Sequence, residues 1–104
     1  MSDYKVIFDE LKWESPFDGV RFKRHIFGKK QIRLIEYRKE FVEPDWCTKG
    51  HTGYVIDGEI EINFNGKTLQ YKNGDAIIIP PGSDSKHKAT ILSETARVYL
   101  VEDI

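Results

Sequence analysis

The chain has 104 residues and a formal net charge of −1, because 16 lysines and arginines nearly balance 17 aspartates and glutamates. This length corresponds to one domain, and a hydrophobic fraction of 39% is that of a folded globular protein. The balanced charge gives no overall attraction to nucleic acid or anionic membrane, and no apolar run reaches membrane-spanning length, so neither partner is expected.

The first half of the chain predicts an irregular N-terminal arm followed by β-strands. Residues 1–19 form the arm, and residues 15–19 have the proline and glycine of a turn. A β-barrel domain is expected over residues 20–104. Apolar residues at 20, 22 and 26 alternate with polar ones at 21, 23 and 25, which predicts a half-buried strand. A second strand covers residues 31–38, where the apolar set changes parity between Leu34 and Ile35 and therefore predicts a bulge.

The second half predicts a series of short strands separated by glycine turns. Residues 54–56 form a strand that turns at Asp57-Gly58, and Ile60, Ile62 and Phe64 then alternate with polar residues. Asn65-Gly66 predicts a hairpin tip, because both central positions of a type I′ turn need a positive φ angle. Further strands are expected near residues 69–71, 76–79, 86–92 and 97–101. About eight short strands without a useful helix predict an all-β barrel or jelly roll.

Residues that can bind metal flank two of these strands. Asp45, Cys47 and His51 precede the strand at residue 54, and His87 lies between two lysines in a later strand. Side chains alternate along a strand, and burying two unpaired ammonium groups would be costly, so His87 is expected to point inward. His51 lies near Gly50 and Gly53, and we expect these glycines to let the backbone turn closely around a ligand.

Each of these residues also has an interpretation without function. A buried histidine can simply bind a backbone carbonyl group, and His51 can be an exposed loop residue. A free cysteine such as Cys47 is most often a small buried hydrophobic residue. Asp45 follows a proline, which is ordinary turn chemistry.

The glycine-punctuated strands resemble the cupin family. The strand and turn Tyr54-Val55-Ile56-Asp57-Gly58 is similar to the end of the first cupin motif. The second motif is similar to Gly74-Asp75, residues 77–79, Pro80-Pro81-Gly82 and His87. The resemblance covers roughly residues 40–102 and implies a double-stranded β-helix, the jelly-roll barrel. His51 stands where the family usually has a glutamate, and Asp45 and Cys47 stand where it has its His-x-His pair.

The resemblance favours a divalent metal and a small molecule bound inside the barrel. Cys47, His51 and His87 are the expected metal ligands, and Asp45 or water completes the shell. Sulfur and imidazole donors favour zinc, iron, copper or nickel over magnesium or calcium. An open coordination position would suit an oxygenase, an isomerase or a lyase acting on a small oxygen-bearing substrate.

Two other functions remain open from the sequence. In a metal-free ligand-binding or sensing barrel, Trp46 and Tyr54 would contact the bound cofactor or ligand, with Tyr37 and Tyr99 as further walls. In a structural module, the barrel would only mediate dimerisation. A homodimer is expected in any case, because strand edges and an N-terminal arm favour pairing between subunits. The single cysteine excludes an internal disulfide, no signal peptide is visible, and the cytoplasm is the expected compartment.

Overall fold

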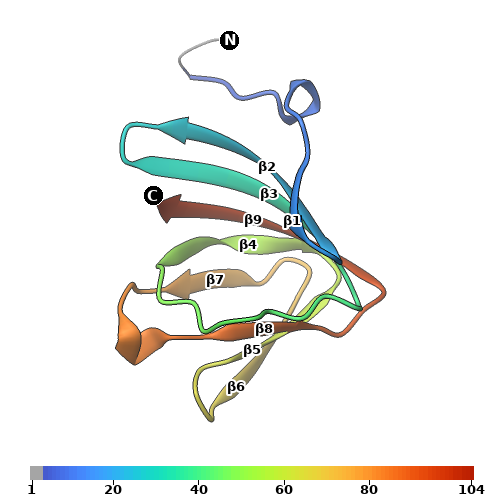
Figure 1. The fold of residues 1–104 in the computed structure, drawn as a ribbon, viewed down its shortest axis with the longest axis vertical. Helices are drawn as coiled ribbons and strands as arrows, with labels where there is room; N and C mark the ends of the chain where they lie inside the picture. The colour runs from blue at the N-terminus through green and yellow to red at the C-terminus, as the bar shows by residue number, and fades with distance from the viewer. Residues whose placement is uncertain (1–3) are drawn as a thin grey trace.

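Residues 4–104 are described by a computed structural model, in which short β-strands make up most of the regular structure (Figure 1). The strands are β1 (Glu14–Phe17), β2 (Val20–Phe27), β3 (Lys30–Arg38), β4 (His51–Asp57), β5 (Glu59–Asn63), β6 (Thr68–Lys72), β7 (Ala76–Ile79), β8 (Lys88–Ile91) and β9 (Thr95–Asp103). Two short 3-10 helices are η1 (Phe8–Glu10) and η2 (Ser83–Ser85). Among the described residues, no helix has the length and apolar character needed to cross a membrane.

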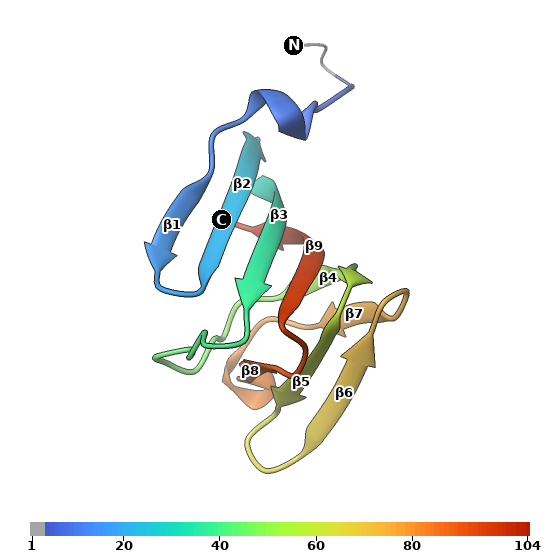
Figure 2. The same ribbon diagram turned by 90° about the vertical axis from the view of Figure 1, so that its right-hand side faces the viewer.

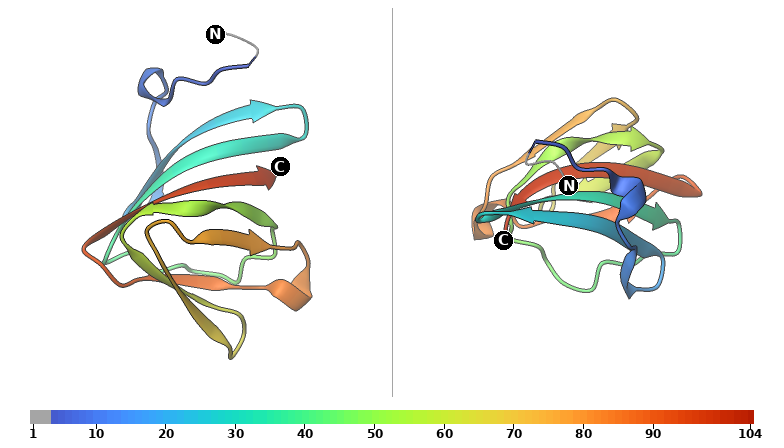
Figure 3. Two further views of the ribbon diagram at one scale, coloured as in Figure 1. Left: turned by 180° about the vertical axis from the view of Figure 1, so that it is seen from behind. Right: turned by 90° about the horizontal axis from the view of Figure 1, so that it is seen from above.

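The strands form two antiparallel sheets that enclose the core (Figures 1 and 3). Within residues 4–104, the large sheet has the order β1-β2-β3-β9-β4-β7 and the small sheet the order β6-β5-β8. The last strand, β9, therefore lies between β3 and β4 in the middle of the large sheet. The fold is a jelly-roll β-barrel, as the sequence predicted.

The core lies between the two sheets and is built from their inward faces. Ile35, Val55 and Val98 of the large sheet are fully buried, and Ile60 and Ile62 of the small sheet pack against the same cluster. Each such side chain contributes about 1.5–3 kcal/mol when it is removed from water. The strict alternation read in the sequence thus corresponds to the inner and outer faces of the sheets.

The hairpin predicted at Asn65-Gly66 is present. Strand β5 pairs with β6 in antiparallel register from Glu59↔Lys72 to Asn63↔Thr68. Asn65 has φ 58° and Gly66 has φ 108°, so both turn residues have a positive φ angle. Glycine adopts it because it has no Cβ atom, and asparagine tolerates it better than most other residues.

The predicted bulge in β3 is wrong, because β3 keeps an unbroken register with both β2 and β9. Gln31 and Arg33 occupy inward positions of β3 and both bind the carboxylate of Glu102 on β9. The change of parity in the sequence therefore marks the point where the inner face of the sheet turns from apolar to polar. The irregular pairing in this part of the sheet falls in β4, between Val55 and Asp57.

The N-terminal segment is more ordered than the sequence predicted. Residues 1–3 lie outside the described residues, but Glu14–Phe17 forms β1, which pairs with β2 at the edge of the large sheet (Figure 2). An edge strand tolerates Pro16 because one side of it needs no backbone donor. The segment also covers part of the outer face, where Lys23 Nζ of β2 donates a hydrogen bond to the Phe8 carbonyl oxygen at 2.9 Å. The same Nζ atom lies 4.8 Å from the centroid of the Trp13 ring.

The two glycines near His51 have structural explanations that the sequence did not predict. A Cβ atom on Gly53 would lie 1.8 Å from the carbonyl oxygen of Tyr99 on β9, and one on Gly50 would lie 3.0 Å from the Pro81 ring. Gly53 thus allows β4 and β9 to approach closely. The close neighbours are β9 for Gly53 and the end of β7 with Pro81 for Gly50, so the chain itself explains both glycines, which corrects the sequence interpretation.

We predict that Gly53→Ala lowers the free energy of unfolding by about 3 kcal/mol or more, since the added methyl group meets backbone that cannot move without disturbing the sheet. Gly28→Ala is the matched control. Gly28 has φ 60° and open space around its Cα, so alanine there costs only about 1–2 kcal/mol of backbone strain. Urea denaturation of the three proteins measures both values. Equal losses would show that the close approach at Gly53 is not tight.

Candidate metal centre

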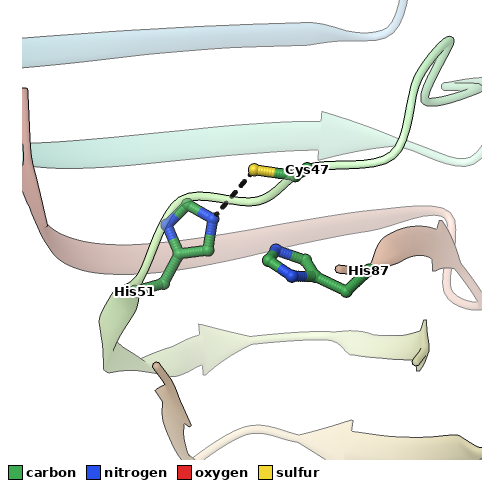
Figure 4. Close-up of side chains that lie close together, drawn as sticks. All are labelled: Cys47, His51 and His87. Carbon is green, nitrogen blue, oxygen red and sulfur yellow. Dashed lines mark hydrogen bonds between the residues drawn. The ribbon is translucent and has the colours of Figure 1, made fainter. Parts of the chain in front are cut away.

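Cys47, His51 and His87 meet at one end of the barrel interior (Figure 4). Their ligand atoms all lie within 4.8 Å of one another. His51 is the first residue of β4, whereas Cys47 and His87 lie opposite each other in an isolated antiparallel bridge. Two backbone hydrogen bonds close that bridge, from Cys47 N to His87 O at 2.9 Å and from His87 N to Cys47 O at 3.0 Å. The topology thus brings together two loops that are forty residues apart in sequence.

Both histidine rings are held through their Nδ1 atoms. Nδ1 of His51 forms an ion pair with the carboxylate of Glu102, and Nδ1 of His87 donates a hydrogen bond to the Ser85 carbonyl oxygen at 3.0 Å. Nε2 of His51 lies 3.4 Å from Sγ of Cys47. Each ring therefore has a fixed orientation, and Nε2 is the nitrogen that remains for a ligand.

Glu102 supports the site from behind. Its side chain is 1% exposed, and it accepts hydrogen bonds from Arg33 Nη2 at 2.8 Å and Gln31 Nε2 at 3.1 Å. Burial alone would raise the pKa of this carboxyl, but His51 and Arg33 outweigh burial and lower it to about 2. Glu102 is therefore ionised at neutral pH and holds a negative charge against the His51 ring.

The electrostatics of the cluster favour a thiolate beside imidazolium. Hydrogen bonds from His51 and then His87 lower the pKa of Cys47 to about 5. Burial opposes the charged form of His51, but Cys47 and Glu102 raise the pKa of this imidazole to about 9. The pKa of His87 is also raised, because its hydrogen bonds to Cys47 and Ser85 outweigh burial. Without a metal, Cys47 and His51 thus hold each other in charged form.

The cluster opens into a cavity of about 180 Å³ between the two sheets. Most of the lining is apolar and includes Phe22 and Phe41, together with aliphatic side chains of both sheets. Arg33, Tyr37 and Glu43 add polar groups to it. Glu43 accepts a hydrogen bond from the Ala89 backbone at 2.9 Å, and burial raises the pKa of its carboxyl group.

The other predicted site residues lie elsewhere. Asp45 is exposed and does not belong to the cluster of metal-binding groups. Trp46 does not line the cavity, and its ring is stacked by Lys86 and Lys88 at 5.3 and 5.1 Å. The two lysines therefore flank His87 on the outside, as the alternation predicted.

The predicted aromatic walls are largely on the outer face of the large sheet. Tyr54 is 45% exposed, and its ring contacts that of Tyr99 at 5.9 Å between centroids. Tyr99 in turn contacts Phe8 of the N-terminal segment. Tyr37 is the one member of the predicted set of four that lines the cavity.

Sequence reasoning did not identify Arg33, Glu43 or Glu102 as part of the site. A signal was present for two of them. Gln31 and Arg33 continue the inward parity of Ile35 on β3, and Glu102 continues that of Val98 and Leu100 on β9. Charged residues at inward positions of neighbouring strands indicate a buried ion pair. Glu43 lies in a loop before Pro44, where no alternation assigns a direction.

Comparisons with known proteins agree with this fold. The profile of the family described as "Cupin domain" matches residues 44–102. No curated protein sequence matches the chain. Among solved structures, KdgF from Halomonas sp. aligns with a TM-score of 0.78 and 22% identity over 93% of this chain and 91% of its own. An RmlC-like cupin from Shewanella frigidimarina aligns with a TM-score of 0.75 and 16% identity, over 98% of this chain and 91% of its own. The polyketide cyclase RemF from Streptomyces resistomycificus aligns with a TM-score of 0.80 and 19% identity, over 98% of this chain and 80% of its own. At these identities the likeness shows the fold alone.

We predict that Cys47 in chelator-treated protein reacts with iodoacetamide with a pH midpoint near 5, because the thiolate population rises with pH through the lowered pKa. His51→Ala removes the largest stabilising hydrogen bond and should move the midpoint upward, toward the value of about 8.5 for a free cysteine. His25→Ala, on β2 outside the cluster, is the control and should leave the midpoint unchanged. A wild-type midpoint near 8.5 would show that Cys47 is not a thiolate paired with the His51 imidazolium.

Proposed function

The chain belongs to the cupin family, whose profile covers more than half of its residues, and on this premise we propose that it binds a divalent metal through Cys47, His51 and His87. A small molecule then binds in the adjoining cavity. The observation that carries the proposal is the tethering of both histidines through Nδ1, one to a carboxylate and one to a backbone carbonyl. Metal-binding histidines nearly always have such a second partner, which fixes the tautomer and directs Nε2 at the metal.

The spacing of the donor atoms fits a metal ion. Ligands at 2.0–2.3 Å from a tetrahedral zinc-like ion lie roughly 3.3–3.8 Å from one another. The Sγ–Nε2 separation between Cys47 and His51 is 3.4 Å, and all three ligand atoms lie within 4.8 Å of one another. Small rotations of the His87 side chain would therefore complete the coordination.

The donor set restricts the metal and the type of site. One sulfur and two imidazole nitrogens favour zinc, iron, copper or nickel over magnesium and calcium. Three protein ligands leave a coordination position for water or substrate, which is the arrangement of catalytic rather than structural zinc sites. A metal bound in this way would polarise an oxygen atom of a small molecule. Oxygenase, isomerase and lyase chemistry are each compatible with these groups.

A metal-free ligand-binding barrel is the second candidate, and the predominantly apolar cavity favours it. In that case Tyr37 would form part of the wall, and His51 and His87 would orient the ligand. The absence of a nucleic-acid partner and the cytoplasmic location stay predictions.

We predict that the purified protein contains about one metal ion per chain after growth with added zinc, iron, copper and nickel. Cys47→Ser, His51→Ala and His87→Ala should each lower this occupancy sharply, because each removes a ligand from a site with only three. Glu102→Gln should weaken the affinity about 10–100-fold, since it removes the second partner of His51. Elemental analysis and competition with a chelating dye provide the two measurements.

Two controls accompany these variants. His25→Ala removes a histidine outside the cluster, and Glu36→Gln removes a carboxylate that binds Arg21 and Arg97 away from the site. Both should retain full metal occupancy, and circular dichroism should show the same β-rich spectrum throughout. Equal and negligible metal in wild type and ligand variants would favour the metal-free barrel.

We further propose that the protein is a homodimer that pairs through the outer face of the large sheet. Tyr54, Ile56 and Ile78 are 45%, 38% and 77% exposed on the outward positions of β4 and β7. We predict that Ile78→Asp converts the dimer to monomer without loss of fold, because it places a charge on this apolar face. Sedimentation velocity gives the result. A wild-type monomer, or a dimer that reducing agent dissociates, would contradict the proposal.

A further inference from the structure

The cavity beside the three ligands contains an arginine whose hydrogen-bonding capacity is not used up. Arg33 donates from Nε and Nη2 to the two carboxylate oxygens of Glu102. Within residues 4–104, these hydrogen bonds leave Nη1 of the guanidinium without a protein partner. The Arg33 side chain is 21% exposed and lines the cavity, so Nη1 is the donor available to a bound molecule.

The position of Arg33 is fixed from two sides. The bidentate pair with Glu102 sets the plane of the guanidinium, and the Phe22 ring lies 5.1 Å from its central carbon. Glu102 itself is held by Gln31 and His51. A binding group held in this way needs little reorganisation when a ligand arrives.

Tyr37 adds a second donor to the same region. Tyr37 lies two residues after Ile35 on β3, so it faces the same side, and it lines the cavity. Burial raises the pKa of its hydroxyl group, which therefore stays protonated. Arg33, Glu43 and Cys47 line the same cavity as Tyr37. The hydroxyl is therefore a neutral hydrogen-bond donor in the cavity that also contains the guanidinium.

Resting on the proposed metal function, we infer that the small molecule is a monocarboxylate with a compact apolar body. Its carboxylate is held by Arg33 and Tyr37 beside the metal centre, and its body fills the apolar part of the cavity. Two further features of the site point to the same class of ligand.

The charge of the loaded site complements a single anion. A divalent ion and Arg33 contribute three positive charges, and the Cys47 thiolate and Glu102 contribute two negative ones. The Arg33 guanidinium and the metal would be the positive groups at the cavity, and a carboxylate pairs with them where a neutral or cationic molecule does not. Glu43 is the remaining carboxyl of the lining and accepts a hydrogen bond from the Ala89 backbone N–H.

The size of the cavity restricts the body of the ligand. Its volume is about 180 Å³, and an apolar cavity of ~150 Å³ is sufficient to hold a benzene molecule. The apolar lining includes Ile60, Ile77 and Leu100, which offer no hydrogen bonds from their side chains. An apolar group about the size of one ring therefore fits better than a polyhydroxylated one.

The experiment compares benzoate with benzamide, a neutral molecule of nearly the same shape. Metal content is measured first, and the metal-loaded wild type is then titrated with each compound by calorimetry. We expect benzoate to bind at least about tenfold more tightly than benzamide, since a hydrogen bond to a charged group is worth about a factor of ten or more. Arg33→Gln and Tyr37→Phe should each reduce this preference, and Arg33→Gln should abolish it.

Arg24→Gln is the matched control. Arg24 lies opposite Arg33 in the pairing of β2 with β3, but it binds Glu14 and does not line the cavity. Its variant should keep the preference for benzoate. If Arg33 only supported Glu102, Arg33→Gln would lower metal occupancy but leave the ratio of benzoate to benzamide affinity unchanged. That result would overturn the inference.

The outcomes separate this inference from the proposed function. A metal-loaded wild type that binds neither compound, or both equally, overturns the monocarboxylate inference and leaves the metal function intact. A wild type without metal contradicts the proposed function, and the metal-free protein is then titrated in the same way. If the metal-free protein prefers benzoate and Arg33→Gln removes that preference, the carboxylate site is supported. If the metal-free protein shows no preference for benzoate, the carboxylate site is overturned. If Arg33→Gln does not fold, Tyr37→Phe and Arg33→Lys test the same preference, with losses expected in both.

Discussion

The buried carboxylate of Glu102 is the interaction on which the site depends. An ionised carboxylate in a protein interior is tolerated only when it is fully paired, and removal of one partner from such a pair costs about 3–5 kcal/mol. Glu102 has partners on both neighbouring strands, with Arg33 and Gln31 on β3 and His51 on β4. The order of the large sheet, with β9 between β3 and β4, is what makes this set of contacts possible. The polar end of the barrel is therefore held by electrostatics, and the other end by aliphatic packing.

The same carboxylate connects two parts of the site with different roles. On one side it fixes the tautomer of His51 and thereby the direction of Nε2, the nitrogen proposed to bind a metal. On the other side it sets the plane of the Arg33 guanidinium in the cavity. A substitution at Glu102 would thus affect the candidate metal centre and the cavity together, whereas a substitution at Arg33 or His51 would act first on its own side. The two halves of the site are coupled through one side chain rather than through the cavity.

The sequence predicted the fold and the central cluster better than it predicted the walls. Strict alternation and the Asn65-Gly66 pair define strands and a hairpin by local rules, and these strands are present. Cys47, His51 and His87 converge as predicted because they flank the motifs of a known topology. Tyr54 and Trp46 were placed wrongly with respect to the cavity, because the direction of an aromatic side chain depends on which face the sheet buries. The inward parity of Glu102 and Arg33 was present in the sequence, but their contact depends on the pairing of β3 with β9, which a local pattern does not reveal.

The isolated bridge between Cys47 and His87 has a consequence for motion. Two of the three candidate ligands, Cys47 and His87, project from loops that few hydrogen bonds join among the described residues. These are the two bonds of the bridge, one from Gly82 N to Thr48 O at 2.9 Å and one from Ala89 N to Glu43 Oε1 at 2.9 Å. An opening that breaks these contacts would separate the two loops and with them the donor atoms. Any ion that binds all three groups therefore binds the closed form alone, and by mass action it shifts the breathing equilibrium toward closure. A bound metal would thus hold these two loops together beside the cavity.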